Sequence, residues 1–121
     1  MKQLLILVVC GILAAGSTDL LAKTKPGTWN GILGDKACAA KMKGDMTKCA
    51  GHTKMCATEP MCAKSGYGLT VDGTFYKFDK KGDAMAAKWL ASTKKDKDLE
   101  VTVTGTMNGK MIKVTDIKDK M

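Results

Sequence analysis

The stretch Leu99 to Ile117, LEVTVTGTMNGKMIKVTDI, predicts a β-hairpin. Apolar and polar side chains alternate from Leu99 to Met107, which is typical of a strand with one buried face. Asn108-Gly109 follows, and this dipeptide favours a type I′ turn with positive φ at both central residues. The chain then returns as a second alternating segment, Lys110 to Ile117. The predicted inner face consists of Leu99, Val101, Val103, Ile112 and Val114.

A second hairpin is predicted upstream, from Tyr67 to Asp72 (YGLTVD) and from Thr74 to Asp79 (TFYKFD). Asp72-Gly73 joins the two segments and is again a type I′ signal. Earlier in the chain, Thr28 to Asp35 (TWNGILGD) also alternates and predicts a first strand.

One segment between the two hairpins has helical periodicity, Asp83 to Ser92 (DAMAAKWLAS). Met85 and Trp89 lie four residues apart and predict one apolar face, and the carboxylate of Asp83 is expected to cap the helix start. The element order is therefore three strands, a helix and two strands, which is the order of the OB-fold, a five-stranded barrel. We predict a mainly β protein of this OB-like class, because closing the sheet removes exposed edges. An open antiparallel sheet packed on one helix is the alternative.

The predicted first and second strands are separated by a cysteine-rich insertion, Lys36 to Ser65. A connection this long is uncommon unless it is functional or has structure of its own. Short helical turns are expected here, two of them capped by Asp35 and Asp45 and a third opened by Pro60. The chemistry-bearing residues of the insertion are Cys38, Cys49, Cys56, Cys62 and the only histidine, His52.

An even number of cysteines in a small exported domain predicts disulfides. Cys38 and Cys62 flank strands expected to be neighbours, so they are the first predicted pair. Cys49 and Cys56 would then pair at the tip, which requires the chain to turn near Gly51. The alternative is a copper or zinc site formed by His52 and the four cysteines, although the insertion contains no Cys-x-x-Cys.

The first 22 residues have the pattern of a signal peptide. Lys2 precedes an apolar run, Leu4 to Ala15, that is too short to span a membrane as a helix. Cleavage is expected after Ala22, or alternatively after Ser17, and Cys10 belongs to the signal. The pattern predicts a periplasmic or secreted protein that does not span the membrane after processing, with one domain over residues 23–121.

All 20 basic residues are Lys, and the formal net charge is +8. The absence of Arg and the expected export argue against a nucleic-acid partner. The charge is compatible with an anionic envelope component, and the densest cluster consists of Lys80, Lys81, Lys94, Lys95 and Lys97. The sequence contains no Gly-x-Ser-x-Gly, no glycine-rich phosphate loop and no His-Glu-x-x-His. We therefore expect no catalytic residues, no cofactor and no enzymatic activity.

Motifs throughout the predicted mature chain resemble those of a family of small exported bacterial proteins of uncharacterised function. They include Trp29-x-Gly31, Asp35-Lys36-x-Cys38-Ala39, Cys62-Ala63-x-Ser65-Gly66-Tyr67-Gly68 and Val101-x-Val103-x-Gly105. The resemblance implies export and an OB-like domain, and it implies no activity. OB-like barrels bind ligands on their second and third strands, where Tyr67, Tyr76 and Phe78 are the candidate contacts. The sequence thus predicts a binding or structural domain, with a copper- or zinc-binding protein as the alternative.

Overall fold

The computed structural model describes residues 24–120, so the predicted signal peptide and Cys10 lie outside the described residues. The strands are β1 (Thr24–Asp35), β2 (Tyr67–Val71), β3 (Thr74–Phe78), β4 (Glu100–Asn108) and β5 (Met111–Asp119). The helices are α2 (Lys36–Met42), α3 (Met46–Ala50), α4 (Lys54–Thr58), α5 (Pro60–Lys64) and α6 (Lys80–Ser92). The protein is mainly β, as the sequence predicts.

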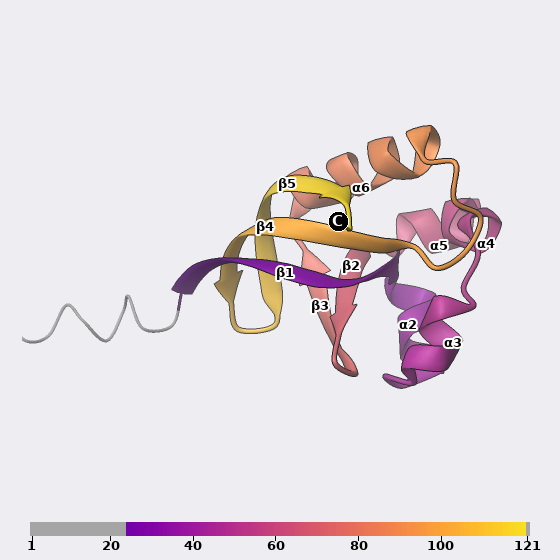
Figure 1. Ribbon diagram of the computed structural model, residues 1–121, viewed down its shortest axis with the longest axis horizontal. Coiled ribbons are helices and arrows are strands. Elements are labelled where there is room, and N and C mark those ends of the chain that lie inside the picture. Colours follow the sequence, from indigo (N-terminus) through magenta and orange to yellow (C-terminus); the bar gives the residue numbers. More distant parts are fainter. Residues whose placement is uncertain (1–23, 121) are drawn as a thin grey trace, which may run out of the picture.

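The five strands form one sheet that closes into a ring in the order β1-β2-β3-β5-β4 (Figure 1). Strand β1 is long enough to pair with both neighbours: it pairs with β4 from Thr24 to Ile32 and with β2 from Ile32 to Asp35. A short parallel pairing of β3 with β5, at Lys77 and Phe78, completes the ring. The sheet is therefore closed, in contrast to the open sheet considered as the alternative, and the closure rests on two residue pairs between β3 and β5.

The two hairpins use different turns. Asp72 and Gly73 both have positive φ, 46° and 85°, as a type I′ turn requires. In the final hairpin Asn108 pairs with Met111, so the two loop residues are Gly109 and Lys110. Only Gly109 has positive φ there (65°), which is the pattern of a type II′ turn rather than the predicted type I′.

Helix α6 begins at Lys80, three residues before the predicted start, and Asp83 is not its cap. The cap is Asp79, whose Oδ1 accepts hydrogen bonds from the N–H groups of Gly82 (3.0 Å) and Val114 (3.1 Å). A side chain at position 82 would collide with Val114 and Phe78, so glycine lets the first turn of the helix approach the sheet. Asp83 instead accepts a hydrogen bond from the Tyr67 N–H (2.8 Å).

The hydrophobic core lies inside the ring and under α6. Leu99, Val101, Val103, Ile112 and Val114 are all buried, which confirms the inner face predicted for the final hairpin. Leu33, Leu69, Phe78, Trp89 and Leu90 complete the core from the other strands and from α6.

The insertion between β1 and β2 folds as the four short helices α2 to α5, grouped at the end of the ring where β1 terminates (Figure 1). Asp35 and Asp45 cap α2 and α3, and Pro60 is the first residue of α5, as predicted. Backbone hydrogen bonds from Lys54 to Asp96 (2.7 Å) and from Asp98 to Ala50 (2.9 Å) fix the insertion to the chain between α6 and β4. None of the described helices has both the length and the hydropathy needed to cross a membrane.

Candidate functional site

Two cysteines of the insertion meet at the point where β1 becomes α2. Asp35 ends β1 and pairs with Tyr67, the first residue of β2, and Lys36 N–H donates to Gly66 O (2.8 Å). This pairing brings α5 beside α2, and the Sγ atoms of Cys38 and Cys62 lie 3.9 Å apart. The predicted proximity of these two cysteines, which depends on the adjacency of β1 and β2, is confirmed.

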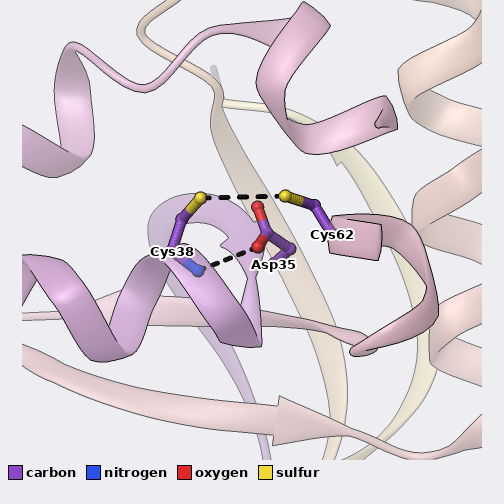
Figure 2. Close-up of side chains that lie close together, drawn as sticks. All are labelled: Asp35, Cys38 and Cys62. Carbon is purple, nitrogen blue, oxygen red and sulfur yellow. Dashed lines mark hydrogen bonds between the residues drawn. The ribbon is translucent and has the colours of Figure 1, made fainter. Parts of the chain in front are cut away.

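The Asp35 side chain lies between the two sulfur atoms (Figure 2). Its carboxylate is fully buried, and its Oδ2 accepts a hydrogen bond from Cys38 N–H (2.9 Å) as the N-cap of α2. One oxygen of Asp35 and the two sulfur atoms all lie within 4.8 Å of one another. We call Asp35, Cys38 and Cys62 the thiol–carboxylate cluster.

Of the three residues of the cluster, His52 contacts Asp35. The His52 Nε2 lies 3.1 Å from Asp35 Oδ1, and the two side chains are only 6% and 0% exposed. The atoms are near enough for an ion pair but are not aligned for a hydrogen bond. In the described part of the chain, Asp35 Oδ1 and both ring nitrogens of His52 therefore have no hydrogen-bond partner. Buried polar groups are nearly always hydrogen-bonded, so a buried carboxylate and imidazole that have only an ion-pair contact with each other are unusual.

The surroundings of the two thiols disfavour their charged form. Burial, and secondly the Asp35 carboxylate, raise the pKa of Cys38 to about 12. The same two causes raise the pKa of Cys62. Both groups are therefore neutral thiols at pH 7, the opposite of the low-pKa thiolates on which cysteine catalysis depends.

Comparison with known protein families, with curated proteins and with solved structures gave no match for this chain.

The four cysteines of the insertion are all free thiols within residues 24–120. The Cys38–Cys62 separation of 3.9 Å exceeds the length of a disulfide bond, about 2.05 Å. Cys49 is buried and Cys56 is exposed, and neither belongs to the thiol–carboxylate cluster. Of the five residues in the alternative metal set, the structure thus brings together Cys38 and Cys62. His52 lies next to them through its contact with Asp35.

The aromatic residues predicted as ligand contacts face the core. Phe78 is fully buried, and Tyr67 is 3% exposed with its hydroxyl donating to Ala57 O (3.0 Å). Tyr76 is half-buried and packs against the core cluster. This arrangement accounts for Tyr67, Tyr76 and Phe78 as packing residues.

A lysine-lined groove with a volume of about 680 Å³ lies between the end of α6 and the end of β5. Trp89 forms part of its wall. Trp89 Nε1 donates a hydrogen bond to Oδ1 of Asp119 (2.7 Å), the acidic residue that lines the groove. Only two members of the predicted lysine cluster line this groove. The lysines of the groove are Lys94, Lys95, Lys118 and Lys120.

Asp35 is the site residue that the sequence interpretation missed, because a helix cap fully accounted for it. The spacing of Asp35 and Cys38 in the sequence could have indicated their contact. An N-cap carboxylate bonds the N–H of the third residue after it, so Asp-x-x-Cys at a helix start places a carboxylate beside a cysteine.

Proposed function

We propose that this protein is a non-enzymatic binding domain whose ligand is a Zn²⁺ ion held by Asp35, Cys38 and Cys62. The observation that carries the proposal is the fully buried carboxylate of Asp35 next to two thiols, with an oxygen atom that no hydrogen bond within residues 24–120 satisfies and that only His52 approaches, at ion-pair distance. A bound cation would replace the thiol protons and would compensate the buried negative charge of Asp35.

The separation of the two sulfur atoms supports a tetrahedral ion. With zinc–sulfur bonds of about 2.3 Å, two thiolates on a tetrahedron lie about 3.8 Å apart. The observed Sγ–Sγ distance is 3.9 Å. This distance matches a shared metal ion and is too long for a disulfide bond.

The carboxylate favours zinc over copper(I). Zinc accepts oxygen as well as sulfur ligands, whereas copper(I) selects soft thiolate and thioether groups. Three protein donors leave the fourth tetrahedral position to water or to another molecule. His52 would orient the Asp35 carboxylate without binding the ion itself, as residues next to metal ligands commonly do.

Metal analysis of the reduced protein tests this function. We expect one equivalent of zinc to bind, and we expect Cys38→Ser and Cys62→Ser variants to lose it while keeping their circular dichroism spectra. Cys56→Ser is the matched control, because Cys56 is exposed and outside the cluster. Reduced wild-type protein that binds no stoichiometric zinc would overturn the proposal. Preference for copper(I) at the same residues would change the identity of the ion.

The proposed setting of this site is an exported, OB-like domain. The strand order β1-β2-β3-β5-β4 and the position of α6 between β3 and β4 support the OB-like assignment. The signal-peptide pattern supports a periplasmic or secreted location. Fractionation of the producing cells, with determination of the N-terminal residue of the exported form, tests the export and both candidate cleavage sites.

The lysine-lined groove favours a second binding role. Four lysines line one groove, and its acidic residue, Asp119, is held by Trp89. Lys94 and Lys95 carry the argument, because Lys118 and Lys120 form exposed ion pairs with Asp116 (3.6 Å) and Glu100 (3.3 Å). A positively charged groove raises the local concentration of anions, so an anionic envelope polymer is the proposed partner. The salt dependence of polyanion binding tests this role.

A further inference from the structure

The two sulfur atoms of the proposed zinc site are also the pair that the sequence predicts as a disulfide. We propose that Cys38 and Cys62 form a redox gate, in which oxidation to a disulfide releases the ion and reduction restores the site. This inference rests on the proposed zinc-binding function.

The gate requires a small movement of two side chains. The sulfur atoms must approach by about 1.9 Å, from 3.9 Å to the length of a disulfide bond. Both cysteines are partly exposed, so a small oxidant can reach them. Cys49 is buried and separate, and Cys56 lies outside the cluster, so the gate uses one defined pair.

The backbone keeps the two cysteines opposite each other in either state. Besides the bond from Lys36 to Gly66, Ala37 N–H donates to Ser65 Oγ (3.1 Å), and Ser65 Oγ–H donates to Cys62 O (2.6 Å). These hydrogen bonds fasten the start of α2 to the end of α5 without involving either sulfur atom. Closing or opening the disulfide therefore leaves the supports of the site in place.

The two states exclude each other chemically. Zinc binds two thiolates, and a sulfur atom within a disulfide carries no such charge. The oxidant is a disulfide, written R–S–S–R, which acts by thiol–disulfide exchange. One zinc-bound protein, one R–S–S–R and two protons give the Cys38–Cys62 disulfide, one free Zn²⁺ and two R–SH. The two thiolates lose two electrons, and the oxidant gains them.

Without its thiolates, the site retains only Asp35 among its three protein ligands. A single carboxylate supported by one histidine is a weak zinc site compared with a set that contains two thiolates. The ion should therefore leave in proportion to the disulfide formed.

The test uses reduced, zinc-loaded protein in the Cys56→Ser background, which removes the exposed competing thiol. Dipyridyl disulfide is added, free zinc is followed with a coloured chelator, and the cysteine pairing is determined by peptide mass mapping. We expect one zinc released for each Cys38–Cys62 disulfide, and rebinding after a reductant is added. Wild-type protein should release the same amount of zinc per Cys38–Cys62 disulfide.

Three results would overturn the gate: zinc retained after the Cys38–Cys62 disulfide forms, zinc released without that disulfide, or both thiols and zinc retained under excess oxidant. A failure of the zinc-binding function is distinguishable, because the reduced protein would then carry no zinc before the oxidant is added. Cys62→Ser, checked for folding by circular dichroism, should neither bind zinc nor form the pair.

Discussion

His52 Nε2 lies 3.1 Å from Asp35 Oδ1, and this contact between a buried imidazole and a buried carboxylate joins the turn after α3 to the start of α2. The carboxylate is thus held from two sides, by the Cys38 N–H at Oδ2 and by His52 at Oδ1. Its orientation toward the two sulfur atoms depends on residues that do not themselves reach them.

Replacing His52 with Gln should weaken zinc binding without removing it. Gln keeps a polar side chain of similar reach but loses the imidazole that faces Asp35 Oδ1. Loss of such supporting residues typically costs about 10–100-fold in metal affinity. Competition with a chelator of known affinity measures the change. A loss as complete as that of Cys38→Ser would show that His52 is a ligand, and an unchanged affinity would show that it has no part in the site.

Replacing Asp35 with Asn should remove the negative charge of this residue while keeping its role as the N-cap of α2. Asn caps helices about as well as Asp, so the free energy of unfolding should change by less than the roughly 1 kcal/mol expected for loss of a cap. The negative charge contributes to the raised pKa values of Cys38 and Cys62, so both pKa values should fall, although burial keeps them above the usual range. Zinc affinity should drop because an amide is a weaker ligand. Urea titration and zinc competition on the same variant report the two effects.

The apo, reduced protein should show a fixed order of cysteine alkylation at pH 8. Cys56 is exposed and should react first, whereas Cys38, with its pKa raised to about 12, should react much more slowly, and the buried Cys49 should also be protected. Only the thiolate reacts, and a pKa four units above the pH leaves about one thiol in 10⁴ ionised. Timed alkylation followed by peptide mass mapping gives the order. Rapid labelling of Cys38 in folded protein would contradict the environment described for it.

The sequence predicts much of this fold because alternation reports burial directly. Leu99, Val101 and Val103 are recognisable as inward-facing from their spacing alone, and all three are fully buried. The Cys38–Cys62 contact also follows from the sequence, once their flanking strands are taken as neighbours.

Other features depend on contacts between distant segments. Lys80-Lys81-Gly82 has the composition of a turn, and Gly82 is helical because it packs against Val114. The His52–Asp35 contact depends on how the short helices α3 and α4 are joined, which no periodic pattern encodes. Tyr67 and Phe78 look like binding residues until the closure of the ring places them in the core.

Asp79 and Asp83 should differ in their contribution to stability. Asp79→Ala removes the cap of α6 and the acceptor for Val114 N–H, and should lower the free energy of unfolding by about 2 kcal/mol. Asp83→Ala removes the acceptor for Tyr67 N–H and a partly exposed ion pair with Lys77 (3.8 Å) that contributes little, and should cost about 1 kcal/mol. Asp79→Asn is the matched control, since it keeps an N-cap oxygen. Equal or reversed costs in urea titrations would contradict the structural cap assignment.

The lysine-lined groove should bind a linear polyanion in a salt-dependent manner. The triple variant Lys94→Gln, Lys95→Gln, Lys118→Gln removes three charges from the groove. Lys118 is paired with Asp116 at the exposed surface (3.6 Å), and Lys120, whose Nζ lies 3.3 Å from Glu100 Oε1, stays in place. For a densely charged polyanion, each lost contact lowers the slope of log K against log salt concentration by roughly 0.7–0.9.

The control is Lys80→Gln, Lys81→Gln, Lys110→Gln, which removes the same charge from exposed positions outside the groove. Titration of heparin-like and uronate polymers at several salt concentrations compares the two variants. Equal losses would mean that net charge alone attracts the polymer, and a larger loss in the groove variant identifies the groove as the binding surface.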